Sequence, residues 1–444
     1  MTVCLVSLGC AKNLVDSERM LYLLREGGYE IVPSPEEAEI AIVNTCGFIQ
    51  AAKEEAIDTI LELAHLKESG SLRFLLATGC LAERYREEVA EQFPELDAIV
   101  GIGDQPNICG ILARMTGGER VTQFAPKCNM PLTGERILST LPFFAYLKIA
   151  EGCSNGCAYC AIPAIRGKYR SVPQEDVLRE AEALAKSGVT EIAVIAQDTT
   201  RYGEDLYGEN RLPALLKQLC AIEGFRWIRV LYCYPERITD ELIETIANEP
   251  KIVKYLDIPM QHCNDGVLKA MRRGCDQASL RALIQKLRTR IPDIVIRTTL
   301  LVGFPGESEE AFNELSEFVQ EMRFDRMGCF AYSEEEHTLA AKMPDQIEPE
   351  IREHRAELLM EQQMQIAAAL NQARIGTETD AVIEGYDEEN AVWLARTAAD
   401  APDVDGRLLI EGSSEEGLQT GQFVRVRLLD TDNIYDMIGE VIGA

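Results

Sequence analysis

The chain has 444 residues, 46% of them apolar, which is enough to form two or three separate hydrophobic cores. It contains no run of eighteen apolar residues and no charged and hydrophobic export signal, so we expect a cytoplasmic protein without membrane contact. A formal net charge of −29 argues against direct nucleic-acid binding, because proteins that bind a phosphate backbone usually have a basic surface; the alternative is that the charge serves solubility alone.

The N-terminal region, residues 1–117, alternates expected strands with expected helices. We predict strands at 3–7, 39–44 and 72–77, and helices at 17–26, 51–66 and 83–92. This alternation is typical of a doubly wound α/β domain, in which helices cover both faces of a parallel sheet.

One cysteine follows each of these three strands. Cys10, Cys46 and Cys80 are 36 and 34 residues apart, about one strand-helix repeat each time. Since the carboxyl ends of parallel strands share one edge of a sheet, the three thiols should converge there. Single cysteines after strands are usually inert, but three in register favour a metal cluster. We therefore interpret these cysteines as metal ligands, because a cytoplasmic chain uses thiols rather than disulfides.

Residues 118–138 lack periodicity and are interpreted as a linker. Strand-helix alternation then resumes over residues 139–372. Strands are expected at 144–150, 191–196, 227–232, 255–258, 295–302 and 327–332, with helices at 174–186, 213–222, 240–248, 278–290 and 307–322 and a final long helix at 350–372. Six strands fit a partial (β/α)6 TIM-like barrel better than a complete barrel of eight.

A short loop after the first of these strands contains three more thiols, Cys153, Cys157 and Cys160. A structural zinc site or an electron-transfer cluster needs four protein ligands, and the loop has three. A cluster on three thiolates leaves one iron free to bind a small molecule. The alternative is a zinc knuckle completed by a distant Cys or His.

This CxxxCxxC loop resembles the signature of radical S-adenosylmethionine (SAM) enzymes, and the flanking residues 161–167 are similar to the methylthiotransferase branch. Residues 7–13, 16–18 and 44–48 also resemble the N-terminal domain of methylthiotransferases. The resemblance implies SAM and two 4Fe-4S clusters. The loop cysteines would hold the cluster that binds SAM and generates a deoxyadenosyl radical, and the N-terminal cysteines would hold an auxiliary cluster that carries the sulfur.

Polar residues just beyond barrel strands face the active site in such folds. By resemblance, Gln197, Gln261, Arg297 and Gly303 would contact SAM, with Gly303 on its adenine side. The residues alone leave alternatives open. Gly303 also suits a plain turn, and Arg297, inside a strand, needs either a buried carboxylate or an anionic ligand. No general acid or base is identified, so the catalytic side chains are unknown.

Residues 373–444 have a different pattern. Five short β runs at 381–384, 391–395, 408–410, 423–429 and 437–441 predict a small OB-like barrel, and this region resembles a TRAM domain. From residue 377 onward there are sixteen Asp or Glu against four Arg and no Lys, a net charge of −12. The acidic loops at 387–389 and 415–416 are candidate docking sites for a basic protein.

The whole chain resembles the methylthiotransferase branch that modifies an aspartate of the twelfth protein of the small ribosomal subunit. Residues 9–13 and 195–203 are similar to that branch, and the acidic barrel suits a basic ribosomal protein. The alternative is the sister branch, which modifies an adenosine in transfer RNA. The resemblance implies addition of a methylthio group to the aspartate β-carbon and the need for an electron donor. The oligomeric state is unknown, with a monomer favoured. A non-catalytic two-cluster electron carrier would instead need four thiolates per cluster.

Overall fold

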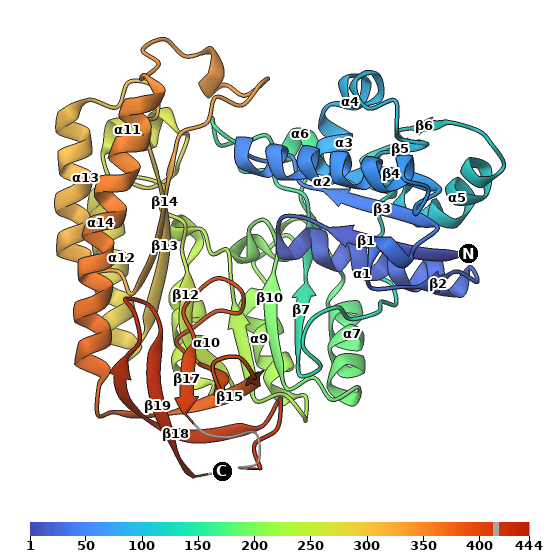
Figure 1. Ribbon diagram of the computed structural model, residues 1–444. Coiled ribbons are helices and arrows are strands. Elements are labelled where there is room, and N and C mark those ends of the chain that lie inside the picture. The colour runs from blue at the N-terminus through green and yellow to red at the C-terminus, as the bar shows by residue number, and fades with distance from the viewer. Residues whose placement is uncertain (412–416, 444) are drawn as a thin grey trace.

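The computed structural model describes the chain except residues 412–416 and 444, and three domains follow one another from the blue to the red end of Figure 1. The first is built on six parallel strands in the order β2-β1-β3-β4-β5-β6. These are β1 (Thr2–Ser7), β2 (Glu30–Ile31), β3 (Ile40–Thr45), β4 (Phe74–Gly79), β5 (Ala98–Val100) and β6 (Val121–Gln123).

Helices cover both faces of this sheet, which confirms the doubly wound prediction. One core packs against α2 (Gln50–Glu68), α3 (Cys80–Arg84) and α4 (Arg86–Gln92). The other core packs against α1 (Ala11–Glu26) and α5 (Ile108–Thr116). Strand β3 is buried along its whole length, as expected for a strand covered on both sides.

The boundary of this domain differs from the sequence-based one. Strand β6 lies inside the stretch 118–138 that was interpreted as a linker, and it pairs with β5 from Ala98 and Val121 onward. Three residues are too few to produce a recognisable alternation, so the strand has no clear sequence signal. The single helix expected at 83–92 is also divided, because α3 ends at Arg84 and α4 begins at Arg86.

The central domain contains the six parallel strands expected of a partial barrel, in the order β14-β13-β12-β11-β10-β7 (Figure 1). The strands are β7 (Phe144–Lys148), β10 (Glu191–Ile195), β11 (Trp227–Val230), β12 (Ile252–Asp257), β13 (Val295–Val302) and β14 (Arg326–Ala331). The helices between them are α7 (Gln174–Lys186), α9 (Leu212–Ala221), α10 (Asp240–Asn248), α12 (Gln277–Arg290) and α13 (Glu309–Met322), and the long α14 (Pro349–Arg374) packs beside β14.

The third domain is a closed five-stranded barrel with its own core, as the sequence predicts. Its strands are β15 (Glu378–Asp387), β16 (Val392–Thr397), β17 (Leu408–Glu411), β18 (Phe423–Thr431) and β19 (Met437–Gly443). The acidic loop at 387–389 joins β15 to β16. The second acidic loop, with Glu415 and Glu416, lies outside the described residues.

Both outer domains pack against the central sheet. One hydrophobic cluster joins Phe144 and Tyr255 of the sheet to Val15 of α1 and to Val382 and Ala401 of the C-terminal domain. In Figure 1 the N-terminal domain and the small barrel occupy opposite ends of the sheet. No helix among the described residues is long and apolar enough to cross a membrane.

Buried ion pairs fix the small barrel to the sheet. Glu191 of β10 accepts hydrogen bonds from Arg229 of β11 at 3.4 Å and from Arg396 of β16 at 2.5 Å, and all three side chains are buried. Asp400 accepts from Arg326 of β14 at 2.6 Å. Part of the acidic charge of the C-terminal domain therefore neutralises arginines of the central sheet rather than facing solvent.

Candidate active site

The three N-terminal thiols lie together at the carboxyl edge of the first sheet, as the spacing predicts. Cys10 precedes α1, Cys46 follows β3, and Cys80 opens α3 directly after β4. Gly9 has φ +86°, and a Cβ there would lie 2.7 Å from the Cys46 sulfur. The absence of a side chain at Gly9 therefore lets Cys46 lie against the turn that leads into Cys10.

The surroundings of these thiols differ. Burial raises the pKa of Cys10, but Lys12, Arg166 and the nearby backbone N–H groups outweigh it, so its pKa is lowered overall. Burial raises the pKa of Cys46, and it raises that of Cys80 to about 12. Because the thiolate is the metal ligand, Cys10 is the thiol best prepared for ligation, and the other two must lose a proton when a metal binds.

The second set of thiols lies in the loop between β8 (Ala150–Glu151) and β9 (Arg170–Ser171), which pair with each other. The loop is held by bonds from Cys153 N to Gly167 O at 3.1 Å and from Ala158 N to Met271 O at 3.0 Å. At Gly152, with φ +74°, a Cβ would lie 2.4 Å from a carbonyl oxygen. Burial raises the pKa of Cys153 to about 11 and also raises that of Cys160.

Each set supplies three sulfur donors, which suit iron or zinc. No three His, Cys, Asp or Glu side chains within the described part of the chain lie close enough together to hold one metal ion. The assignment of both sets as ligands of iron–sulfur clusters stays a prediction.

The two sets meet where the first domain contacts the central sheet. Cys80 packs against Ala161 and Ile165, which belong to the segment that follows Cys160. Helix α6 (Ile162–Arg166) contacts α3, the helix that Cys80 opens. Any groups held by the two sets of thiols would therefore be neighbours.

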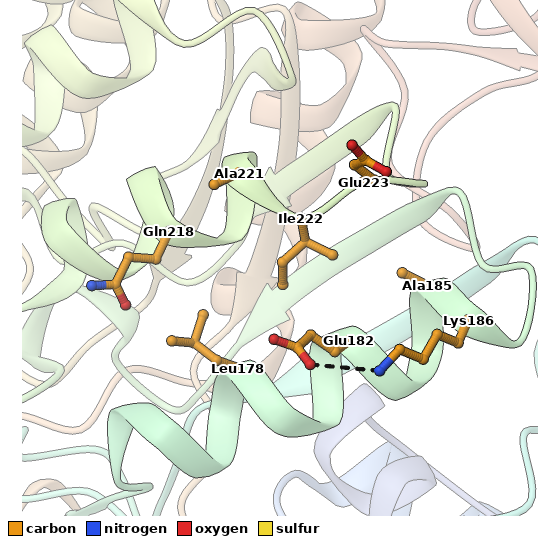
Figure 2. A pocket seen from close by; sticks show the side chains of 8 residues that line it. All are labelled: Leu178, Glu182, Ala185, Lys186, Gln218, Ala221, Ile222 and Glu223. Carbon is orange, nitrogen blue, oxygen red and sulfur yellow. Dashed lines mark ion pairs between the residues drawn. The ribbon is translucent and has the colours of Figure 1, made fainter.

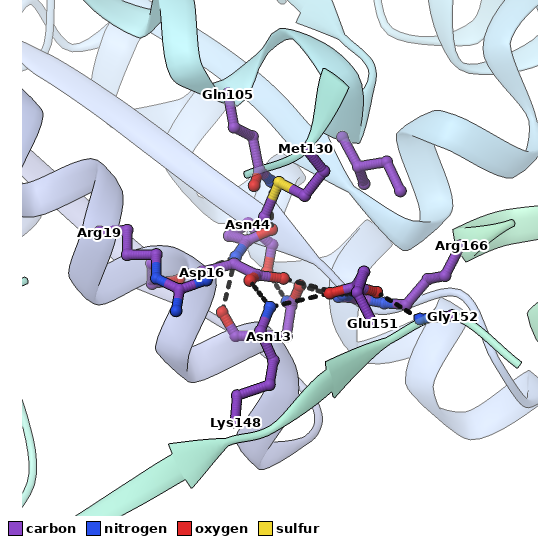
Figure 3. Close-up of polar contacts among 12 residues, drawn as sticks. Asn13, Asp16, Arg19, Asn44, Gln105, Met130, Lys148, Glu151, Gly152 and Arg166 are labelled. Atoms are coloured by element: carbon purple, nitrogen blue, oxygen red, sulfur yellow. Dashed lines mark hydrogen bonds and ion pairs between the residues drawn. The ribbon is translucent and has the colours of Figure 1, made fainter. Parts of the chain in front are cut away.

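Charged residues surround this meeting point. The sequence indicates no role for Lys148, and by resemblance it places Arg166 only loosely with the SAM contacts. Lys148 and Arg166 lie among the carboxylates of Asp16 and Glu151, all at most 1% exposed (Figure 3). Lys12 is also buried, and its Nζ lies 3.3 Å from the centre of the Tyr232 ring. The sequence contains one signal for this group of charges, the lysine at position 148 inside an expected strand. A lysine buried in a strand needs a buried partner of opposite charge.

The four residues expected to contact SAM have different surroundings, and the first two, Gln197 and Gln261, lie near strand ends. Gln197 lies two residues beyond β10 and is partly exposed. Gln261 has φ +72° and bonds to β13 through its N–H to Thr299 O at 2.8 Å. A non-glycine residue in this conformation persists only where the surrounding structure imposes it. Both residues lie near strand ends, and their contact with SAM stays a prediction.

Arg297 and Gly303 have protein partners. Arg297 donates to Asp257 at 3.1 Å and lies 3.6 Å from Asp405 of the C-terminal domain, so it has the carboxylate partners that one of the two alternatives requires. A Cβ at Gly303 would lie 2.4 Å from the side chain of Arg352 in α14. The lack of a side chain at Gly303 therefore makes room for this arginine, and contact of either residue with SAM stays a prediction.

A pocket opens beside the second set of thiols. Its lining includes Arg84 of α3, Ala164 of α6 and Glu336 of the loop after β14, together with Cys160 and Lys127. Glu335 fixes this loop to the first domain by accepting from Arg84 at 2.6 Å and from Lys53 at 3.1 Å. Cys160 is thus one of the residues that line this pocket.

A second groove lies between α7 and α9 on the outer side of the sheet, and Figure 2 shows its lining. Its walls are aliphatic residues such as Leu178 and Ile222, with a Glu182–Lys186 ion pair of 3.7 Å at its edge. It contains no cysteine and no buried charge. We therefore do not consider it a candidate for the chemistry.

Comparison with known proteins covers the full chain. Family models match in three places: Uncharacterized protein family UPF0004 at 2–101, the Radical SAM superfamily at 147–319, and the TRAM domain at 375–442. The protein named ribosomal protein uS12 methylthiotransferase RimO of Desulforamulus reducens is 50% identical and covers 98% of both chains. The protein of the same name from Geobacter sulfurreducens is 48% identical and covers 99% of this chain and 98% of its own.

Solved structures show the same fold at low identity. The radical SAM methyltransferase TsrM of Kitasatospora setae has a TM-score of 0.55 at 15% identity and covers 75% of this chain and 74% of its own. The cobalamin-dependent radical SAM enzyme OxsB has a TM-score of 0.51 at 13% identity and covers 82% and 57%. With full-length relatives at up to 50% identity, the chain belongs to the RimO family of methylthiotransferases, within the radical SAM superfamily.

Proposed function

We propose that this protein transfers a methylthio group to the β-carbon of an aspartate in ribosomal protein uS12. The observation that carries the proposal is the meeting of two sets of three thiols at one domain boundary, in a chain about half identical to proteins named for that activity. In this proposal each set holds a 4Fe-4S cluster. The ligands are Cys10, Cys46 and Cys80 in the first domain, and Cys153, Cys157 and Cys160 in the central one.

Bound clusters and SAM supply the one-electron chemistry that functionalises an unactivated carbon, for which acid–base catalysis is a poor tool. The protein's own residues hold and shield the reacting groups. Cys46, Cys80, Cys153 and Cys157 are less than 9% exposed, which keeps water from the reacting centres. The pocket beside Cys160 gives the target loop of the substrate access to this region.

The test is an anaerobic incubation with SAM, a chemical reductant and either uS12 or unmodified transfer RNA. Mass spectrometry of both substrates decides between the branches. Addition of one methylthio group to a uS12 aspartate is expected. Modification of an adenosine in transfer RNA alone would overturn the proposal in favour of the sister activity. An electron donor is required in the cell, and the reductant replaces it here.

A spectroscopic result is also expected. If Cys153, Cys157 and Cys160 leave one iron without a protein ligand, SAM should bind that iron and change the paramagnetic resonance spectrum of the reduced cluster. A variant with alanine at Cys10, Cys46 and Cys80 isolates this signal. An unchanged spectrum at saturating SAM would exclude direct binding to the iron.

The acidic loop between β15 and β16 is proposed to dock the basic substrate. Glu388 and Glu389 are exposed, whereas Asp387 also shapes the turn, because its carboxylate accepts from the N–H groups of Glu389 and Asn390 at 3.0 and 3.2 Å. The screening length in physiological salt is about 8 Å, so the loop acts only on a partner that touches the small barrel itself.

We therefore expect Glu388→Lys with Glu389→Lys to raise the Michaelis constant for uS12 by about 2- to 10-fold at low salt, since an exposed charge pair contributes about 0.2–1 kcal/mol. Added salt should reduce the difference. The control is Glu353→Lys with Glu361→Lys, which makes the same change of charge on the exposed face of α14. Equal effects of the two double variants would mean that net charge alone, and not this loop, governs binding.

A further inference from the structure

A buried group of four charges lies between the two sets of thiols. Asp16 comes from α1, Lys148 from the end of β7, Glu151 from β8, and Arg166 from the end of α6 (Figure 3). Lys148 contacts both carboxylates, and Arg166 Nη1 lies 2.8 Å from Asp16 and 3.1 Å from Glu151. Two cations thus balance two carboxylates, and the group joins the first domain to the central sheet.

Arg166 has one N–H group without a hydrogen-bond acceptor in the described part of the chain. Its Nη1 donates to the two carboxylates and its Nη2 donates to Asn13 Oδ1 at 3.0 Å. Its Nε is buried and has no hydrogen-bond partner among the described residues. A buried N–H without an acceptor is costly, and native structures rarely keep one. Eight other arginines also have a buried Nε without a partner among the described residues, so it is the place of Arg166 next to the N-terminal thiols that makes a bound group the expected acceptor.

Cys80 lies beside the helix that ends at Arg166. The neighbouring Ile165 packs on Cys80, and α6 contacts α3, which Cys80 opens. Asn13, whose Oδ1 accepts from Arg166 Nη2, donates its backbone N–H to Cys10 O at 2.8 Å, so the guanidinium lies next to the turn that carries Cys10. The guanidinium is thus close to two of the three N-terminal thiols.

We infer that Arg166 is a positioning residue for the cluster on Cys10, Cys46 and Cys80, and that its free Nε–H donates to a sulfur of that centre. The inference rests on the proposed function. Hydrogen bonds to sulfur and nearby positive charge stabilise the reduced, more negative form of an iron–sulfur cluster and so raise its reduction potential. Arg166 follows Cys160 by six residues, so one short segment serves both centres.

The experiment isolates this cluster in the full-length chain by replacing Cys153, Cys157 and Cys160 with alanine. In that background, Arg166 is compared with Arg166→Gln and Arg166→Lys in anaerobic redox titrations followed by paramagnetic resonance, with iron content determined for each. We expect Arg166→Gln to shift the midpoint potential to a more negative value. Arg166→Lys should give a smaller shift in the same direction, because it keeps the charge and loses the planar set of donors.

Lys148→Met is the matched control. It removes one cation from the same buried group and leaves the same two carboxylates short of a partner, but Lys148 contacts those carboxylates rather than a thiol. Its shift should be much smaller than that of Arg166→Gln. In the reciprocal background, with alanine at Cys10, Cys46 and Cys80, Arg166→Gln should not move the potential of the remaining cluster.

The outcomes separate the two proposals. An unchanged potential in iron-loaded Arg166→Gln, or an equal shift in Lys148→Met, would overturn the inference and leave the proposed function intact. If the parent chain with alanine in the loop binds no iron, the proposed function fails and the inference fails with it. If Arg166→Gln loses its iron, Arg166→Lys decides, since a negative shift supports the inference and no shift overturns it.

Discussion

Replacing Cys157 with alanine is expected to abolish the reductive cleavage of SAM. Cys157 is the middle one of the three thiols in its loop, all proposed as cluster ligands, and no fourth cysteine stands in that loop to replace it. Loss of a residue that merely supports a metal ligand lowers metal affinity or activity by about 10- to 100-fold. Loss of the ligand itself should therefore lower the rate of SAM cleavage by more than about 100-fold. The measurement is the release of deoxyadenosine and methionine from SAM under anaerobic conditions with a strong reductant.

Cys46→Ala should behave differently. Cys46 lies in the first domain, at the edge of the other sheet, so the loop of the central domain keeps its three thiols. Cleavage of SAM should stay measurable, whereas modification of uS12 should fall to background. Iron content should drop in both variants, and circular dichroism should confirm that both are folded. Equal loss of SAM cleavage in both folded variants would refute this division between the two sets of thiols.

The sequence predicts that each set of thiols comes together, because the spacing of the cysteines is a local and repeated pattern. Cys10, Cys46 and Cys80 each follow a strand, and parallel topology alone then brings them to one edge. The loop cysteines are close in sequence, so their meeting needs no tertiary information. Strands β10 and β13 were also placed correctly, because their apolar runs of five and eight residues are long enough to recognise.

Contacts between domains could not be predicted in the same way. The partners of Arg297 are Asp257 and Asp405, which lie 40 residues before and 108 residues after it. The Arg352 side chain that occupies the space beside Gly303 comes from a helix whose packing no local pattern specifies. The sequence established that a buried charge needs a partner, but the choice between carboxylate and ligand depended on the tertiary structure.

The largest effect on stability is expected for Glu191→Gln. Glu191 is fully buried and is shared by Arg229 and Arg396, which are also buried. Although burial opposes it, Glu191 raises the pKa of Arg396, so this arginine stays charged in the interior. Glutamine is nearly the same size but carries no charge, so both guanidinium groups would lose their shared counter-charge. Breaking a buried ion pair by removing one partner costs about 3–5 kcal/mol.

The loss of stability in Glu191→Gln should appear first where the small barrel meets the central sheet, because Arg396 belongs to β16 and Glu191 to β10. Hydrogen exchange is expected to rise across β15 and β16, and limited proteolysis should release the C-terminal barrel sooner than in the unmodified chain. Glu384→Gln is the control. Glu384 also accepts from Arg396, at 2.9 Å, but it is partly exposed and leaves Arg396 paired with Glu191, so a loss of about 1 kcal/mol or less is expected. If the two variants exchange and unfold alike, the buried pair does not hold the barrel in place, and the hydrophobic cluster around Phe144 and Ala401 must do so instead.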